Sequence, residues 1–175
     1  TVVQKIVDYE TNPPQAPGFY ERATVAGYYQ DDDPRDGYAD RRFLHTCEDV
    51  RDFLVGEGYT VERIYTTKSS VTPRYYNKSR YSNGEPIPSE LLRSSGYPWD
   101  GDAADILDAL HNGTFLVLHR DHGMDWNDSR FSSTGWGDPY FTQAHLPQLA
   151  NGSLLPVVLS VNCETGWFDG ETDDD

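Results

Sequence analysis

A histidine and a cysteine stand at the ends of the two most apolar segments of this sequence. One segment starts at residue 115 and leads through Leu-Val-Leu-His-Arg-Asp to His122 and Gly123, and the other starts at residue 157 and leads to Cys163. An imidazole that draws the proton from a thiol leaves a thiolate, which is the nucleophilic form of cysteine. The two residues therefore suggest thiol catalysis. Gly123 would let the backbone approach a substrate and offer its N–H to a developing oxyanion.

Residue types alone leave other interpretations open. A cysteine is often a small buried side chain without chemistry, and we expect this of Cys47, which lies on the apolar face of a predicted helix. His119 and His122 are separated by two residues, so a metal site at the strand end is an alternative to catalysis.

Alternating helices and strands are predicted to position these residues. Helical spacing or an apolar face predicts helices over residues 2–10, 43–54, 103–112 and 142–149, and apolar or β-branched runs predict strands over 19–30, 59–66, 114–119 and 154–161. Asp102 can cap the third helix, and Gly113 lies beyond its end. This order predicts an α/β fold with a mainly parallel sheet flanked by helices. The last two strands are expected to be buried on both faces. In such sheets, sites form beyond the carboxyl ends of the strands, where the histidine and the cysteine are placed.

Length and charge restrict the function further. A chain of 175 residues suits one domain, with residues 67–99 as a long loop or insertion because they lack periodicity. A net charge of −15 argues against a nucleic-acid partner. No apolar run approaches the roughly 20 residues of a membrane span, and no signal peptide is visible. Acidic clusters at 31–36, at Asp125 and Asp128, and at 169–175 are candidates for calcium ligands, although none matches an EF-hand loop.

Several segments resemble the gingipain family of clan CD cysteine peptidases. They are the opening Val-Val-Gln-Lys-Ile-Val-Asp-Tyr-Glu helix, the strand ending in His-Gly, and the segment Val-Asn-Cys-Glu-Thr-Gly-Trp-Phe at 161–168. The resemblance covers nearly the whole chain. It implies a three-layer caspase-like fold and a cysteine endopeptidase that cleaves proteins or peptides through an acyl-enzyme. It also implies a secreted or cell-surface bacterial setting and no cofactor for catalysis, with structural calcium as an option.

The resemblance implies roles for individual residues. His122 becomes the general base and Cys163 the nucleophile, and the backbone N–H groups of Gly123 and Cys163 become the oxyanion donors. An acidic group that steadies the histidine is expected after the first strand, where Gln30, Asp31 and Asp32 lie, and Asp31 is preferred. Asp40 stands near the position of an aspartate that holds a basic P1 side chain in some members. Trp126, Trp136 and Trp167 lie near the proposed cleft in sequence, and Trp167 is the candidate for a substrate-pocket wall.

Departures from the family pattern keep two alternatives open. Asn162 stands where many relatives have a small residue, and the family domain continues with further strands after the nucleophile. We therefore expect residues 1–175 to be a partial caspase-like catalytic domain that needs the remainder of its parent chain. The alternatives are a non-catalytic caspase-like module for binding or secretion, and a metal-binding domain that uses His119, His122 and acidic partners.

Overall fold

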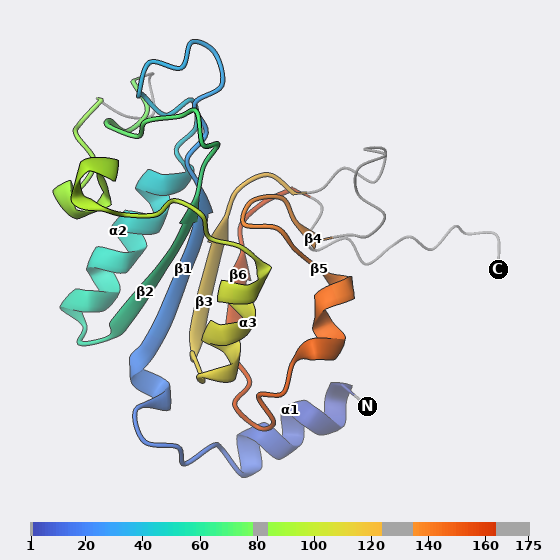
Figure 1. Cartoon of the computed structure of the whole chain (residues 1–175). Helices are drawn as coiled ribbons and strands as arrows, with labels where there is room; N and C mark the ends of the chain where they lie inside the picture. Colours follow the sequence, from blue (N-terminus) through green and yellow to red (C-terminus); the bar gives the residue numbers. More distant parts are fainter. Residues whose placement is uncertain (1, 79–83, 124–134, 164–175) are drawn as a thin grey trace, which may run out of the picture.

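Four parallel strands form the centre of the molecule. The computed structural model describes residues 2–78, 84–123 and 135–163. The sheet has the order β2-β1-β3-β6, with strands β1 (Arg22–Tyr28), β2 (Thr60–Thr66), β3 (Leu116–Arg120) and β6 (Val157–Ser160). All three neighbouring pairs are parallel, so the carboxyl ends of the strands share one rim, as Figure 1 shows. The predicted mainly parallel sheet is confirmed.

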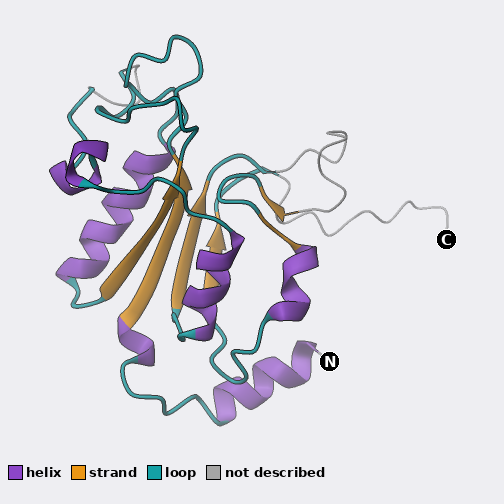
Figure 2. Ribbon diagram, viewed as in Figure 1, coloured by secondary structure: helices purple, strands orange, loops and turns teal. Residues whose placement is uncertain are grey.

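Helices cover both faces of this sheet (Figure 2). Helix α2 (Phe43–Gly56) packs on the face that carries Val25 and Leu118, and helix α3 (Ala103–His111) packs on the face that carries Ala26 and Val117. Consecutive strand residues point to opposite faces, which explains this division. Helix α1 (Val2–Thr11) lies beyond the amino ends of the strands. The result is the predicted arrangement of a sheet between two helical layers.

The start of α3 is fixed by its own sequence. The Asp102 carboxylate accepts hydrogen bonds from the backbone N–H groups of Ala104 at 2.7 Å and Asp105 at 3.2 Å. The Asp105 side chain in turn accepts from the N–H of Asp102 at 3.0 Å. This reciprocal capping box satisfies backbone donors that the first turn leaves unpaired, and it confirms the cap predicted at this residue.

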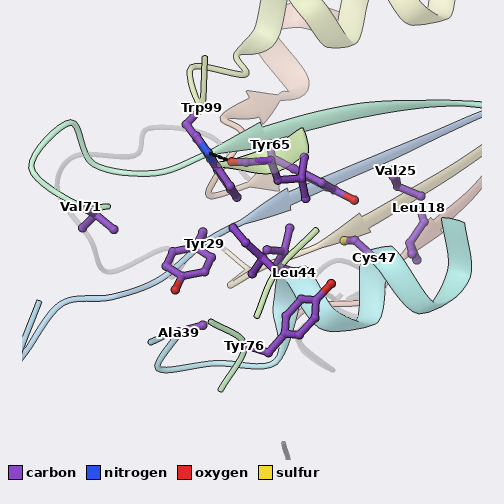
Figure 3. Packing of buried hydrophobic residues seen from close by; sticks show 12 residues of the cluster. Val25, Tyr29, Ala39, Leu44, Cys47, Tyr65, Val71, Tyr76, Trp99 and Leu118 are labelled. Atoms are coloured by element: carbon purple, nitrogen blue, oxygen red, sulfur yellow. Dashed lines mark hydrogen bonds between the residues drawn. The ribbon is translucent and has the colours of Figure 1, made fainter. Parts of the chain in front are cut away.

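Residues 67–99 form a long loop, but several of their side chains are part of the hydrophobic core. The segment has two short 3-10 turns, η2 (Ser89–Leu91) and η3 (Arg93–Ser95), in its described part. Val71, Leu91 and Trp99 are nevertheless buried in the cluster of Figure 3, which also holds Cys47. The indole N–H of Trp99 donates to the carbonyl of Leu91 at 2.7 Å, so its polar atom is satisfied inside the core. Cys47 is a core residue, as predicted.

The expectation that residues 154–161 form a strand covered on both faces was wrong. β6 spans only Val157–Ser160 and is the edge strand of the described sheet. Val157, Val158 and Leu159 are 47%, 47% and 45% exposed. An apolar run occurs in a buried strand and in an edge strand alike, so composition alone did not distinguish them.

Two other elements differ from prediction in type or length. Phe19–Glu21 forms a 3-10 turn (η1), and β1 begins only at Arg22 and ends at Tyr28, two residues before Gln30. The predicted helix at 142–149 is a 3-10 helix, η4 (Gln143–Gln148), with Pro147 inside it. A proline has no N–H for an i→i−4 bond, which disfavours a regular α-helix there.

A two-stranded antiparallel unit stands beside the rim. It consists of β4 (Gly135–Trp136) and β5 (Phe141–Thr142), and Trp136 also forms an isolated antiparallel bridge with Gly123. In the described ranges, no helix combines the length and the apolar character needed to cross a bilayer.

Candidate active site

His122 and Cys163 follow neighbouring strands at equal distances from the last paired residues. The register of β3 and β6 pairs His119 with Ser160, and each candidate residue comes three positions later. Backbone pairing continues past the strand ends, because the N–H of Val161 donates to the carbonyl of His119 at 3.0 Å. The segments that follow β3 and β6 therefore leave the sheet side by side at its carboxyl rim.

Gly123 lies directly against the backbone of Cys163. A Cβ atom on Gly123 would overlap the Cys163 carbonyl group and lie 3.0 Å from the Cys163 Cα. A glycine is required at this contact because any side chain would push the two segments apart. The close approach brings together the backbones of both residues that the sequence suggested as oxyanion donors.

The two cysteines have opposite environments. Cys163 is exposed, and Cys47 is fully buried between α2 and the sheet. Burial raises the pKa of the Cys47 thiol well above its usual value, because the interior disfavours a thiolate. Thiol chemistry with an external reagent is therefore restricted to Cys163 among these two.

His122 is exposed and held by contacts on two sides. Its Nε2 lies 2.8 Å from Oε1 of Gln30, and the ring of Phe43 meets it edge-on at 5.0 Å. Desolvation, followed by the positive charges of Arg41 and Arg120, lowers the pKa of His122. A neutral imidazole that donates from Nε2 to an amide oxygen keeps Nδ1 unprotonated, so Nδ1 is the atom that can accept a thiol proton.

The amide of Gln30 is itself oriented by charged neighbours. Its Nε2 donates to Oδ2 of Asp32 at 2.8 Å, and the other oxygen of Asp32 accepts from Lys68. The hydrogen bond from Lys68 is the largest cause that lowers the pKa of Asp32, so this carboxylate is ionised. With its amide nitrogen directed at Asp32, Gln30 presents its oxygen to His122.

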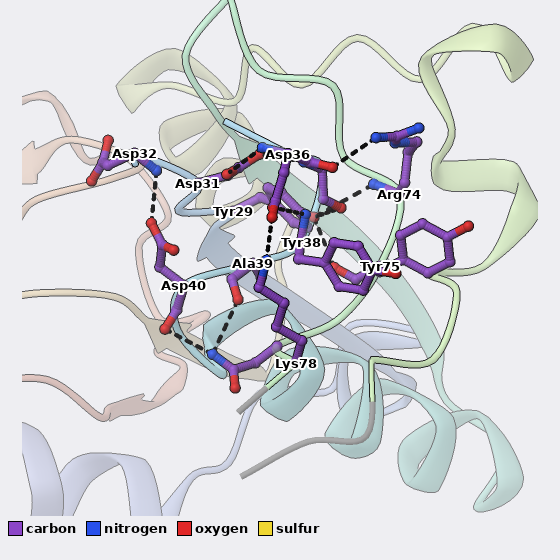
Figure 4. Close-up of polar contacts among 12 residues, drawn as sticks. Tyr29, Asp31, Asp32, Asp36, Tyr38, Ala39, Asp40, Arg74, Tyr75 and Lys78 are labelled. Carbon is purple, nitrogen blue, oxygen red and sulfur yellow. Dashed lines mark hydrogen bonds and ion pairs between the residues drawn. The ribbon is translucent and has the colours of Figure 1, made fainter. Parts of the chain in front are cut away.

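Asp31, the preferred partner of the histidine, is engaged elsewhere. Its carboxylate is buried and accepts from the N–H of Gly37 at 2.9 Å and of Asp36 at 3.3 Å, which closes the loop after β1 (Figure 4). Burial raises the pKa of Asp31, and these two hydrogen bonds oppose that effect. The described contact to His122 comes from Gln30, one of the three residues at the position that the resemblance indicated, although an acidic side chain was expected there.

Asp40 lies at the other end of the same loop. Its N–H donates to the carbonyl of Gln30 at 2.7 Å. Its Oδ2 accepts from the N–H of Asp32 at 2.7 Å (Figure 4). Both interactions join Asp40 to the two residues that precede the loop. The structure therefore joins Asp40 to the segment that carries Gln30, and one oxygen of its carboxylate is used in a backbone contact.

Asp121 is a buried carboxyl group that the sequence gave no reason to single out. Its Oδ2 accepts from the N–H of Asp138 at 2.6 Å, whereas its Oδ1 is buried without a hydrogen-bond partner among the described residues. Burial, with a smaller contribution from the charge of Asp138, raises the pKa of Asp121 to about 7. Asp121 joins the end of β3, immediately before His122, to the segment after β4.

The described residues do not support the metal-site alternative. His119 is buried, with Nε2 3.2 Å from the carbonyl of Asp138 and Nδ1 3.0 Å from the amide nitrogen of Asn162. Both of its ring nitrogens are thus occupied, and His122 is bonded to Gln30. Within residues 2–78, 84–123 and 135–163, no group of three or more His, Cys, Asp or Glu side chains is arranged to hold a metal ion.

Acidic side chains after β1 have protein partners in place of a cation. Asp36 accepts from Lys78, Asp32 from Lys68, and Asp31 from backbone N–H groups. The predicted acidic cluster is thus a loop held by ion pairs and backbone contacts. The other acidic candidates, Asp125, Asp128 and 169–175, lie outside the described residues.

The predicted tryptophan wall is tested at one position only. Trp136 is buried and stacks on His119 at 4.2 Å with an interplanar angle of 3°, so it packs inside the domain. Trp126 and Trp167 lie outside the described residues.

The fold and the rim chemistry define a class of protein. A parallel sheet between helical layers, with a histidine and an exposed cysteine at one rim, is consistent with caspase-like cysteine peptidases. The sequence model for Peptidase family C25 matches residues 1–175. The chain belongs to this family, which is the gingipain family of cysteine peptidases.

Individual relatives are similar over a shorter stretch. Gingipain R2 and gingipain R1 of Porphyromonas gingivalis are each 36% identical to the chain over 64 residues, which is 37% of the chain. The match covers 8% of that gingipain R2 and 6% of that gingipain R1, so the chain spans a small part of the length of these relatives. No solved structure matches the chain significantly.

Proposed function

We propose that this chain carries the catalytic dyad of a cysteine endopeptidase, with Cys163 as nucleophile and His122 as general base. The observation that carries the proposal is the position of the two residues, three places beyond paired residues of adjacent parallel strands. The exposure of Cys163 and the neutral state favoured at His122 are both suited to this chemistry.

The proposed reaction has two steps and needs no cofactor. Nδ1 of His122 takes the proton of the Cys163 thiol, and the sulfur attacks the scissile carbonyl carbon. The carbon–nitrogen bond then breaks, His122 gives the proton to the leaving amine, and a thioester remains. Water, deprotonated by the same imidazole, attacks the thioester and releases the thiol and the carboxylic acid. The N–H groups of Gly123 and Cys163 stabilise the oxyanion of both tetrahedral intermediates.

Gln30 is the proposed third member of the site. Its oxygen fixes the ring of His122 and the tautomer in which Nδ1 is free to accept a proton. An amide orients the imidazole as an acidic group would, but it adds no negative charge. Asp31, the earlier candidate for this role, supports the loop that holds Gln30 and Asp40.

Asp40 and Trp167 are the candidates for substrate recognition. Asp40 is the candidate for holding a basic P1 side chain, because its backbone is bonded to Gln30 beside His122. Trp167 remains a candidate for the pocket wall. We also propose a secreted or cell-surface bacterial protein that acts on proteins or peptides, in which residues 1–175 form part of the catalytic domain.

The test uses the natural full-length protein and a mixture of fluorogenic peptides. We expect Cys163→Ala and His122→Ala each to reduce cleavage by at least about a thousandfold, because the nucleophile and its base act as a unit. The matched control is Cys47→Ala, which removes the buried thiol. The folded fraction of this variant should retain turnover. Unchanged cleavage by Cys163→Ala would refute the proposal.

A further inference from the structure

A chain of four side chains lies beneath the rim, directly before the proposed nucleophile. The indole N–H of Trp136 donates to Oγ of Ser160 at 2.7 Å, and Ser160 donates to Oδ1 of Asn162 at 2.9 Å. The amide nitrogen of Asn162 lies 3.0 Å from Nδ1 of His119, and Nε2 of His119 lies 3.2 Å from the carbonyl of Asp138. The chain thus connects β4, β6, β3 and the segment after β4.

Each of these hydrogen bonds has one possible direction. The carbonyl of Asp138 can only accept, so Nε2 of His119 carries the proton. Burial lowers the pKa of His119 to about 3, so the ring is neutral and its Nδ1 accepts from the amide nitrogen of Asn162. The amide oxygen of Asn162 then accepts the Ser160 hydroxyl, whose oxygen accepts from Trp136. Since all assignments agree, the chain specifies one orientation of the Asn162 side chain.

The hydrogen-bonded series of side chains is anchored in the protein interior. His119 has no exposed surface and stacks on Trp136, which is 9% exposed. Trp136 also pairs through its backbone with Gly123. Trp136 therefore contacts Gly123, one proposed oxyanion donor, directly. Through Ser160 it also reaches Asn162, the residue before Cys163, which is the other proposed donor. Hydrogen bonds inside a protein are costly to break, so this arrangement resists displacement.

We propose that the Trp136–Ser160–Asn162–His119 chain positions the backbone of Cys163 relative to Gly123, so that both N–H groups face the substrate oxyanion. The proposal deepens the peptidase function and rests on it. Asn162 and Ser160 are positioning residues that act through the backbone of Cys163. Asn162, the polar residue before the cysteine, thus has a specific partner in His119.

The experiment compares turnover with simple thiol reactivity in the natural full-length protein. Asn162→Ala and Ser160→Ala remove links of the chain without changing the dyad. We expect kcat for peptide cleavage to fall about fivefold to tenfold for each, the effect of losing one neutral hydrogen bond, with KM little changed. Alkylation of Cys163 by iodoacetamide needs no oxyanion donors, so its rate should stay within about twofold. Ser160→Thr keeps the hydroxyl and should retain kcat.

The outcomes separate this inference from the proposed function. If Cys163→Ala abolishes cleavage but Asn162→Ala and Ser160→Ala both retain full kcat, the positioning role is wrong and the peptidase function stands. If kcat and alkylation fall together, the variants disturb the dyad itself, which also overturns the positioning role. Nitrogen-15 NMR of His119 gives a second measurement that requires no activity. The proton should reside on Nε2, and a proton on Nδ1 would contradict the chain.

Discussion

Oε1 of Gln30 lies 2.8 Å from Nε2 of His122, although 92 positions separate the two residues in the sequence. This contact joins the end of β1 to the end of β3 across the rim of the sheet. It determines which nitrogen of His122 is free to accept a proton, so much of the proposed chemistry depends on it.

Replacing Gln30 tests this contact. Gln30→Ala removes the acceptor, and we expect kcat to fall about fivefold to tenfold, since one hydrogen bond is lost. Gln30→Glu retains an acceptor and adds a negative charge, which should raise the pKa of His122 in an NMR titration. Gln15→Ala is the control, because that exposed side chain bonds only to the nearby carbonyl of Pro13 among the described contacts. Equal kcat for Gln30→Ala and the natural protein would exclude an orienting role.

A methyl group at Gly123 should separate the two strand ends. Gly123→Ala introduces a Cβ that overlaps the Cys163 carbonyl, so we expect peptide cleavage to be lost and stability to fall by about 1 to 3 kcal/mol. The matched control is Gly56→Ala at the end of α2, where a Cβ meets no atom within 4 Å. Calorimetry and a cleavage assay of both variants provide the measurement. Activity retained by Gly123→Ala would show that the two backbones are not in close contact.

Arg41 should contribute to the lowered pKa of His122. After desolvation it is the largest cause, and the surface position of its charge limits the effect through screening. In a Cys163→Ala background, we expect Arg41→Gln to raise the pKa of His122 in an NMR titration. Arg35→Gln, which removes a charge bonded to Ser70 instead, is the control. A pKa that stays the same or falls in Arg41→Gln would contradict this electrostatic account.

The raised pKa of Asp121 should make the stability of the protein depend on pH. Burial raises its pKa to about 7 in the folded protein, from about 3.9 in the unfolded chain. Its protonated form therefore favours folding, and this contribution is fully present below about pH 4 and is lost as the pH rises through about 7. Asp121→Asn stays uncharged at every pH, so its stability relative to the natural protein should increase from pH 4 to pH 8.

Urea unfolding across this range measures the difference, which we expect to change by on the order of 2 to 4 kcal/mol. The charges that act on Asp121 are those of Asp138, which raises its pKa, and Arg120, which lowers it. Asp8→Asn on the exposed surface of α1 serves as control. A difference that is constant with pH would show that Asp121 titrates in its ordinary range.

The sequence was sufficient to predict the elements that position His122 and Cys163. Apolar runs ending in His122 and Cys163, separated by helical segments, imply parallel strands with a common carboxyl rim. The capping aspartate of α3 and the buried Cys47 were predicted for the same kind of local reason. These features depend on residues close together in the chain or on a strong periodic pattern.

Other features depend on contacts between distant segments. The contact of Gln30 with His122 results from where β1 stops and how the following loop returns at Asp40, and neither is encoded in a local pattern. The exposure of β6 depends on its place at the edge of the described sheet. The burial of Trp99 likewise depends on a long segment folding back onto the core, which composition did not indicate.

The central claim is that His122 activates the thiol of Cys163, and the rate of Cys163 alkylation at neutral pH tests it most directly. Iodoacetamide labelling of the natural full-length protein, resolved by mass spectrometry, reports both cysteines, with buried Cys47 as internal reference. We expect His122→Ala to slow the labelling of Cys163 at neutral pH by about tenfold or more, because the imidazole that takes the thiol proton is gone. Equal labelling rates for Cys163 in the two proteins would contradict the dyad.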